Sequence, residues 1–147
     1  MKVLLVHNFY NVTGGECHAV RTQETLLRER GHEVVPFYRD SKALKAGSPL
    51  QKLGAAAGVS ENRSAMRDLE RLVREQRPQV AHVHNVFPMI SPRVYSRLQA
   101  LGVPVVQTVH NLRLRCPGGL MFTQGEVCDD CTREGFGRAA AKRCVQN

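Results

Sequence analysis

The feature that most constrains the fold of this chain is an N-terminal pattern of strand, glycine pair and helix. Residues 2–7 (KVLLVH) form a short apolar run of the kind found in fully buried parallel strands. Residues 16–30 follow a helical pattern, and Gly31 stands where helices often end in a left-handed residue. Gly14 and Gly15 lie between the two patterns. This order is typical of an α/β protein.

The glycine pair, Gly14 and Gly15, predicts a preformed anion site. Unpaired amides of the first helical turn point outward, the helix dipole favours negative charge, and glycine lets a phosphate group approach the backbone closely. The spacing differs from the G-x-G-x-x-G pattern of dinucleotide-binding folds. The alternative, a tight turn from strand to helix that binds nothing, stays open.

The rest of the chain repeats the alternation of strand and helix. Further strands are expected at residues 33–38, 80–84 and 103–110, and further helices at 61–76, with Ser60 as N-cap, and from Ser91-Pro92 to 101. Residues 40–58 read as a loop, because their Ser, Lys, Gly and Pro follow no clear period. Crossovers of helical length predict a doubly wound parallel sheet with helices on both faces.

Polar residues are expected at the carboxyl ends of three strands, where sheets of this kind bind ligands. They form three His-Asn pairs: His7-Asn8, His84-Asn85 and His110-Asn111. With Tyr10 they predict a crevice beside the glycine pair that binds phosphate or sugar hydroxyls, with an imidazole able to exchange protons near neutral pH. A satisfied structural histidine is the alternative at each single position.

The charge balance predicts an acidic partner. Lys and Arg total 21 against 13 Asp and Glu, a net charge of +8 in 147 residues. The low aromatic content of 5%, without Trp, makes nucleic acid an unlikely partner, because it provides no base-stacking platform. A basic stripe fits an anionic membrane surface or an ordinary exposed helix face, and consists of Arg63, Arg67, Arg71 and Arg74.

No apolar run reaches the roughly 18–20 residues of a membrane span, and the N-terminus begins as a strand rather than as a signal sequence. We therefore expect a cytoplasmic protein. Peripheral association with the inner membrane is left open.

Four of the five cysteines are grouped in the C-terminal segment with the spacing C-x11-C-x2-C-x12-C: Cys116, Cys128, Cys131 and Cys144. In a chain without a secretion signal this pattern predicts a tetrahedral structural Zn²⁺, which has no open position for catalysis. Reduced or paired cysteines and an iron–sulfur cluster are the alternatives. Cys17 is expected to be a buried small apolar residue, with a reactive thiol at the helix start as the other interpretation.

Several stretches resemble the N-terminal domain of family 4 glycosyltransferases of the GT-B fold. They are KVLLVHNFYNVTGGE, LLRERGHEV, VAHVHNVFPMISP and GVPVVQTVHNLRLRCPGGLMF. The resemblance implies a Rossmann-like domain that mostly receives the acceptor, opposite a C-terminal domain that binds the nucleotide-sugar donor. It also implies retaining sugar transfer without a catalytic metal, onto a glycan or lipid-linked acceptor, as in cell envelope polysaccharide synthesis.

The resemblance also implies roles for individual residues. Gly14, Gly15 and Glu16 would form the loop at the donor diphosphate, and His110 would act as the catalytic residue beside the transferred sugar. His84 and Asn85 would line the acceptor side. This agrees with the crevice that the strand ends predict, to which His7, Asn8, Tyr10 and Asn111 also belong.

We expect residues 1–110 to form the Rossmann-like core of an incomplete N-terminal GT-B half. Residues 111–147 are then a Cys-rich insertion and the start of the next helix. The donor-binding domain, with its basic clamp and paired glutamates, is absent from the sequence. We therefore expect no transferase turnover by this chain alone, which would need the missing C-terminal domain as its complementing half. The rival hypothesis is a non-catalytic, zinc-stapled binding module for an acidic partner.

Overall fold

The computed structural model describes residues 1–10, 14–41, 62–113 and 115–144. The chain divides into two compact units, Met1–Thr108 and Val109–Asn147, and each is described by itself. The second unit begins before the boundary after residue 110 that the sequence suggests, so His110 belongs to the second unit rather than to the first.

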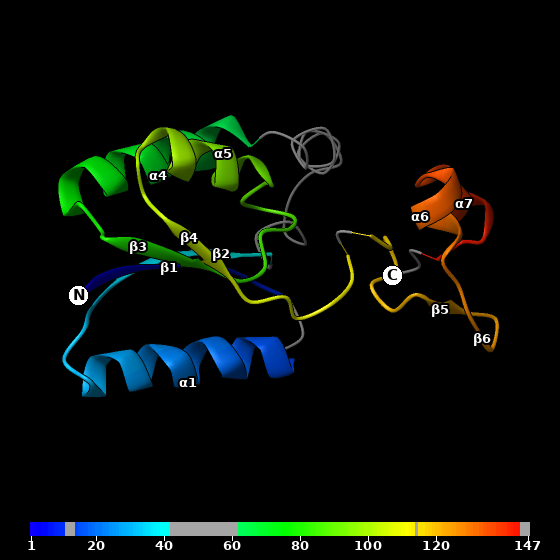
Figure 1. Ribbon diagram of the computed structural model, residues 1–147, viewed down its shortest axis with the longest axis horizontal. Coiled ribbons are helices and arrows are strands. Elements are labelled where there is room, and N and C mark those ends of the chain that lie inside the picture. Colours follow the sequence, from blue (N-terminus) through cyan, green and yellow to red (C-terminus); the bar gives the residue numbers. More distant parts are fainter. Residues whose placement is uncertain (11–13, 42–61, 114, 145–147) are drawn as a thin grey trace. The chain divides into compact units, whose positions relative to one another are not determined.

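The first unit is built on a four-stranded parallel sheet (Figure 1). Its strands are β1 (Lys2–Phe9), β2 (Glu33–Asp40), β3 (Val80–Val83) and β4 (Val105–Gln107), in the order β2-β1-β3-β4. All three pairings are parallel, so the four carboxyl ends lie at one edge of the sheet, here called the C-terminal edge. The strand order reverses between β1 and β3, which is the position where open α/β sheets bind ligands.

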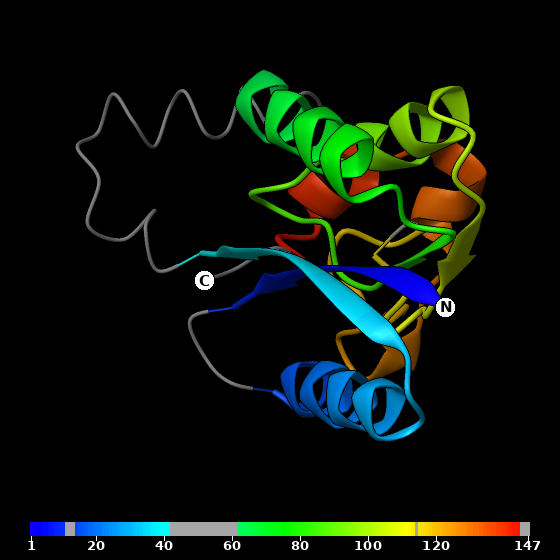
Figure 2. The ribbon, with the colours of Figure 1, turned by 90° about the vertical axis from the view of Figure 1, so that its left-hand side faces the viewer.

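Helices cover both faces of this sheet. Helix α1 (Gly15–Glu29) lies on one face, and α4 (Arg63–Gln76) and α5 (Arg93–Ala100) lie on the other, as the two perpendicular views in Figures 1 and 2 show. The predicted doubly wound, Rossmann-like α/β fold is therefore confirmed. Pro36 lies in β2, an edge strand, where a residue without an N–H group is tolerated.

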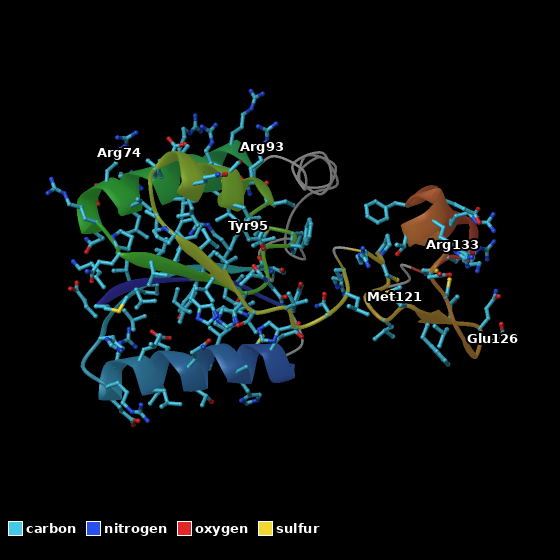
Figure 3. All side chains as sticks on the ribbon, in the orientation of Figure 1. Arg74, Arg93, Tyr95, Met121, Glu126 and Arg133 are labelled. Atoms are coloured by element: carbon cyan, nitrogen blue, oxygen red, sulfur yellow. The ribbon has the colours of Figure 1, made fainter. Side chains whose placement is uncertain are left out.

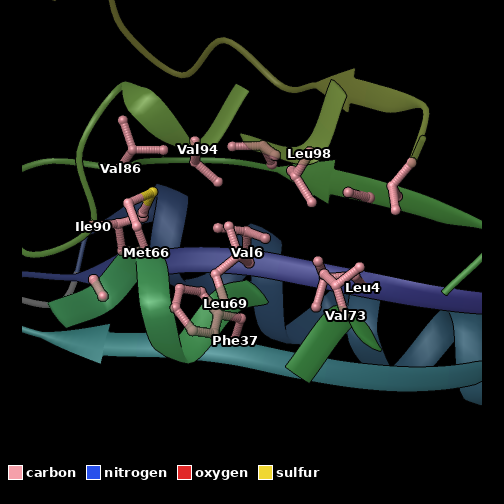
Figure 4. Close-up of a cluster of buried hydrophobic side chains, with 14 of the residues drawn as sticks. Leu4, Val6, Phe37, Met66, Leu69, Val73, Val86, Ile90, Val94 and Leu98 are labelled. Carbon is pink, nitrogen blue, oxygen red and sulfur yellow. The ribbon is translucent and has the colours of Figure 1, made fainter. Parts of the chain in front are cut away.

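The main hydrophobic core lies between the sheet and helices α4 and α5 (Figure 4). Alternate residues of β1 supply opposite faces, so Leu4 and Val6 enter this core while Val3 and Leu5 point to the side of α1. Fully buried Leu69 of α4 lies near its centre (Figure 4). The side of α1 is smaller, and this helix buries only two of its own described side chains, Cys17 and Val20. The expected burial of Cys17 is thus confirmed.

Two predicted boundaries were wrong. Strand β4 covers Val105–Gln107 instead of residues 103–110. It ends early because β3, its strand partner among the described residues, ends at Val83. Beyond β3 the chain turns toward β1, and the N–H of Asn8 donates to the carbonyl of Asn85 at 2.8 Å. Pairing to β4 therefore stops after Thr108, whose N–H donates to the carbonyl of Val83.

The start of α4 also differs from the prediction. Asn62 is its N-cap, and the Asn62 Oδ1 accepts from the N–H of Ala65 at 3.0 Å. The predicted cap, Ser60, and most of the expected loop at residues 40–58 lie outside the described residues.

The second unit contains small elements joined by turns. A two-stranded antiparallel hairpin is followed by two five-residue helices: β5 (Phe122–Thr123), β6 (Glu126–Val127), α6 (Asp130–Glu134) and α7 (Gly137–Ala141). Gln124 and Gly125 connect the strands, and both have positive φ, as a tight hairpin turn of the primed type requires.

None of the helices in the described ranges is both long and apolar enough to cross a membrane.

Candidate functional site

The C-terminal edge of the sheet carries a row of three imidazole rings. His7 and His84 are buried, and their ring centroids lie 6.0 Å apart in an edge-to-face arrangement. The ring of His82 stacks on that of His84 at 4.4 Å, and His82 Nε2 lies 2.7 Å from the hydroxyl of Thr108. Strand alternation explains the row, because these residues of β1 and β3 point to the side of α1. The rings of His7 and His84 are part of the protein interior and do not face solvent.

Asn8 lies on the other face of the same edge and is completely buried. Its Nδ2 donates to the hydroxyl of Ser41 at 2.8 Å and to the carbonyl of Phe9 at 3.2 Å, while its Oδ1 accepts from the N–H of Met89 at 3.3 Å. The amide therefore ties the ends of β1 and β2 to the loop after β3. In this structure Asn8 shapes the edge from inside.

The other two predicted residues of this edge are less enclosed. Asn85 and Tyr10 are both half-buried. Among the described residues, the Asn85 Nδ2 is a buried donor atom without a hydrogen-bond acceptor. Since buried polar atoms are usually paired, this side chain is a candidate for contact with a ligand.

A second amide network, which sequence reasoning missed, fixes the end of β3. The Gln107 Nε2 donates to the carbonyls of His84 and Thr108 at 3.0 and 2.8 Å. Its Oε1 accepts from the hydroxyl of Tyr95 on α5 at 2.5 Å. Burial raises the pKa of Tyr95, which keeps the phenol a neutral donor. The sequence signal that could have indicated this network is a single glutamine in an otherwise apolar strand.

Replacing Gln107 with leucine is expected to lower the free energy of unfolding by about 2–3 kcal/mol. The change leaves the carbonyl of His84 and the hydroxyl of Tyr95 without their partner. Each loss costs about 1–1.5 kcal/mol, the lower part of the range for unpaired groups, because both groups are partly buried. Urea unfolding of the full chain measures it. The same substitution at exposed Gln99 is the control and should change stability by less than about 0.5 kcal/mol. Equal effects at both positions would show that the network contributes nothing.

The glycine pair stands at the beginning of α1, which follows β1 and so starts at the C-terminal edge. Gly14 is the N-cap, with extended backbone at φ −102° and ψ 179°, and it offers no side-chain cap. Its carbonyl accepts from the N–H groups of Cys17 and His18 at 3.1 and 3.3 Å. The N–H groups of Gly15 and Glu16 have no acceptor within the helix, as in any first helical turn.

Among the described residues, neither lack of space nor backbone conformation requires a glycine at position 14 or 15. A Cβ on Gly15 would meet no described atom within 4 Å, and one on Gly14 would touch only the Glu16 side chain, at 3.9 Å. Neither backbone has positive φ. Space beside outward-facing amides is what a bound phosphate group needs.

The predicted pair His110-Asn111 does not end a strand. Both residues are half-buried and belong to the second unit. The Asn111 Oδ1 accepts from the N–H of Arg113 at 3.1 Å, which caps a local turn. The prediction of three equivalent His-Asn pairs at strand ends was therefore wrong for this pair, because β4 ends at Gln107.

Residues 12–126 match the model of Glycosyltransferase Family 4, which is more than half of the chain. The chain belongs to glycosyltransferase family 4. The resemblance recognised in the sequence is thereby confirmed, and the four-stranded parallel sheet agrees with the Rossmann-like half of a GT-B fold. No curated protein and no solved structure matches the chain.

The family 4 match includes the glycine pair, the edge residues after β3 and His110, and it ends at Glu126. Of the four grouped cysteines it includes only Cys116, while Cys128, Cys131 and Cys144 lie beyond it. The family match therefore covers residues of the C-terminal edge, but it does not cover three of the four grouped cysteines.

These four cysteines line one cavity of about 80 Å³ within the second unit. Burial raises the pKa of Cys116, but the backbone N–H groups of residues 118–121 outweigh this effect and lower the pKa overall. Burial, followed by the charges of the other three sulfurs, raises the pKa of Cys131. Throughout the described residues, no three His, Cys, Asp or Glu side chains already have the positions of a metal site.

Proposed function

We propose that this chain is the acceptor-side domain of a retaining glycosyltransferase that uses a nucleotide-sugar donor. Family membership supports sugar transfer in general, with a sugar donor and an acceptor as partners. The observation that carries the finer proposal is the glycine pair at the start of α1, where first-turn amides without a helical acceptor stand beside space that no described atom fills within 4 Å of a Cβ on Gly15. A diphosphate group has the negative charge and the acceptor oxygens that this helix start would bind.

In this proposal the residues divide into three roles. Gly14, Gly15 and Glu16 form the diphosphate loop, and Glu16 gives the loop a carboxylate in the first turn of α1. His110 serves as the catalytic residue at the transferred sugar, with Asn111 beside it in the chain. Asn85 and Tyr10 contact the acceptor, a glycan or a lipid-linked sugar, while buried His7, Asn8 and His84 position this edge from inside.

Transfer itself requires a donor-binding domain, and we propose that the 147 residues alone bind ligands without turnover. The reaction would need no catalytic metal.

A cytoplasmic location with peripheral contact to an anionic membrane belongs to the same proposal, because lipid-linked acceptors reside there. Arginines project away from the sheet along α4 and α5, as Arg74 and Arg93 show in Figure 3. Three others, Arg63, Arg67 and Arg97, line a cavity of about 400 Å³ between these helices. Cationic helix faces attract anionic lipid headgroups.

Replacing Gly15 with alanine is expected to weaken binding of a nucleoside diphosphate at least tenfold, because a methyl group would occupy space that the phosphate needs. Stability should stay constant or rise by up to about 1 kcal/mol, since the helical backbone accepts alanine. Calorimetric titration with UDP, GDP and inorganic pyrophosphate, together with urea unfolding, measures both quantities.

Gly137→Ala is the matched control, because Gly137 is also an exposed first residue of a helix and has no described atom within 4 Å of a Cβ. This control should bind as the original chain does. Absence of diphosphate binding, or equal affinity of both variants, would refute the proposed diphosphate loop.

A further inference from the structure

We propose that the second unit holds one structural zinc ion, bound by the sulfurs of Cys116, Cys128, Cys131 and Cys144. This site is separate from the proposed sugar-transfer function, and three of its four residues lie beyond the family 4 match. Zinc is the ion for which four thiolates in tetrahedral arrangement are a common structural site.

First, the four cysteines converge on one cavity, although they span residues 116–144 of the sequence. The four cysteines come from four different segments: the turn before β5, the residue after β6, helix α6, and the residues after α7. All of them line the same cavity within the second unit. The two ends of the group both lie close to Gly118, because a Cβ there would lie 3.2 Å from the carbonyl oxygen of Cys144 and 3.8 Å from the Cys116 sulfur.

The second argument is the backbone around these sulfurs. Hydrogen bonds fix the backbone that carries the cysteines: the N–H of Gly119 donates to the Cys116 carbonyl at 2.7 Å, the N–H of Cys128 to the carbonyl of Met121 at 2.9 Å, and the N–H of Cys144 to that of Ala139 at 3.0 Å. Hydrogen bonds from outer groups orient metal ligands and stabilise their charge. Lys142 adds a cation, with its Nζ 3.5 Å from the Cys128 sulfur and 2.6 Å from Asp130.

The third argument is the small core of this unit. Of its described residues, only Gly119 and Ala139 are buried, while Leu120, Phe122, Val127 and Phe136 are 55–84% exposed. Two five-residue helices and a hairpin with two residues in each strand do not bury enough apolar surface to hold such a segment together. Binding energy from a structural metal supplies folding energy directly.

Zinc binding then requires a short movement of the thiols. In the described structure no three His, Cys, Asp or Glu side chains are close enough together to bind one metal ion. The sulfurs must therefore turn into the cavity that they line. Sulfurs at about 2.3 Å from zinc lie about 3.8 Å from one another, which fits within a cavity of about 80 Å³. Rotation about the Cα–Cβ bonds and shifts of the turns are the movements that the proposal requires.

The test uses the full 147-residue chain purified under reducing conditions without chelator. Elemental analysis should find about one zinc per chain, and thiol titration should find four thiols protected until a strong chelator is added. Replacement by Co²⁺ should give the intense visible absorption of tetrahedral thiolate cobalt. Cys131→Ser should lower the zinc content well below one, while Cys17→Ser, the matched control, should keep it.

The unsubstituted chain decides the outcome even if Cys131→Ser fails to fold. Metal-free folded protein in which the four grouped thiols all react would overturn the proposal, as would a mass lower by about 4 Da, which indicates two disulfides. Iron with visible absorbance in place of zinc would also overturn it.

Discussion

Replacing Leu69 with alanine is expected to lower the free energy of unfolding of the first unit by about 2–5 kcal/mol. Leu69 is fully buried where α4 meets the sheet, and it packs in the same core as Leu4, Val6 and Phe37 (Figure 4). Alanine removes three carbon atoms and leaves a cavity that β1 and β2 cannot close without losing their pairing. Urea unfolding followed by circular dichroism measures the change.

Leu26→Ala is the control for this prediction. Leu26 is 43% exposed on α1, so the same substitution should change stability by about 0.5 kcal/mol or less. A loss at Leu69 no larger than the loss at Leu26 would mean that the core does not lie between α4 and the sheet.

The second large effect is expected at Asn8, where alanine should cost about 3 kcal/mol. The substitution removes three hydrogen bonds and leaves the N–H of Met89 and the hydroxyl of Ser41 without their partner in the interior. It should also loosen the C-terminal edge, because Asn8 joins the ends of β1 and β2 to the loop after β3.

Hydrogen exchange of the full chain can separate this effect from a general loss of stability. Amides at the C-terminal edge should lose more protection than those at the other end of the sheet. Gln79→Ala is the control, since the Gln79 amide makes one exposed bond, to the N–H of Lys2, and should cost about 1 kcal/mol or less. Asn8→Ala with unchanged stability would contradict a structural role for Asn8.

Most of the fold could be predicted from the sequence because the local signals agreed with one another. The apolar run of β1, the helical period of α1 and the glycine after it all indicate one strand–helix unit, and the structure has both elements within two residues of the prediction. Repetition of that unit fixed a parallel, doubly wound sheet.

Strand ends were harder to predict, because they depend on partners distant in sequence. From the sequence, residues 108–110 could extend β4. The pairing nevertheless ends where β3 ends, at Val83, and the sequence of β4 gives no information about the length of β3. His110 was consequently assigned to a strand end that it does not occupy.

The roles of the polar residues at the edge were also outside the reach of sequence patterns. His7, Asn8 and His84 were predicted as crevice residues, and they do gather at the C-terminal edge, but their side chains are buried. Whether a polar residue faces a ligand or a neighbouring strand depends on burial and hydrogen bonds, which spacing does not encode. Gln107 was missed for the same reason.

The proposed binding of a diphosphate at the start of α1 is tested most directly by amide chemical-shift mapping. The amides of the first unit are followed in the full chain during titration with pyrophosphate and with UDP. If the start of α1 binds the diphosphate, the amides of Gly14, Gly15 and Glu16 shift first, along one saturating curve. Shifts confined to the arginines of α4, or no saturable shift at the start of α1, would contradict it.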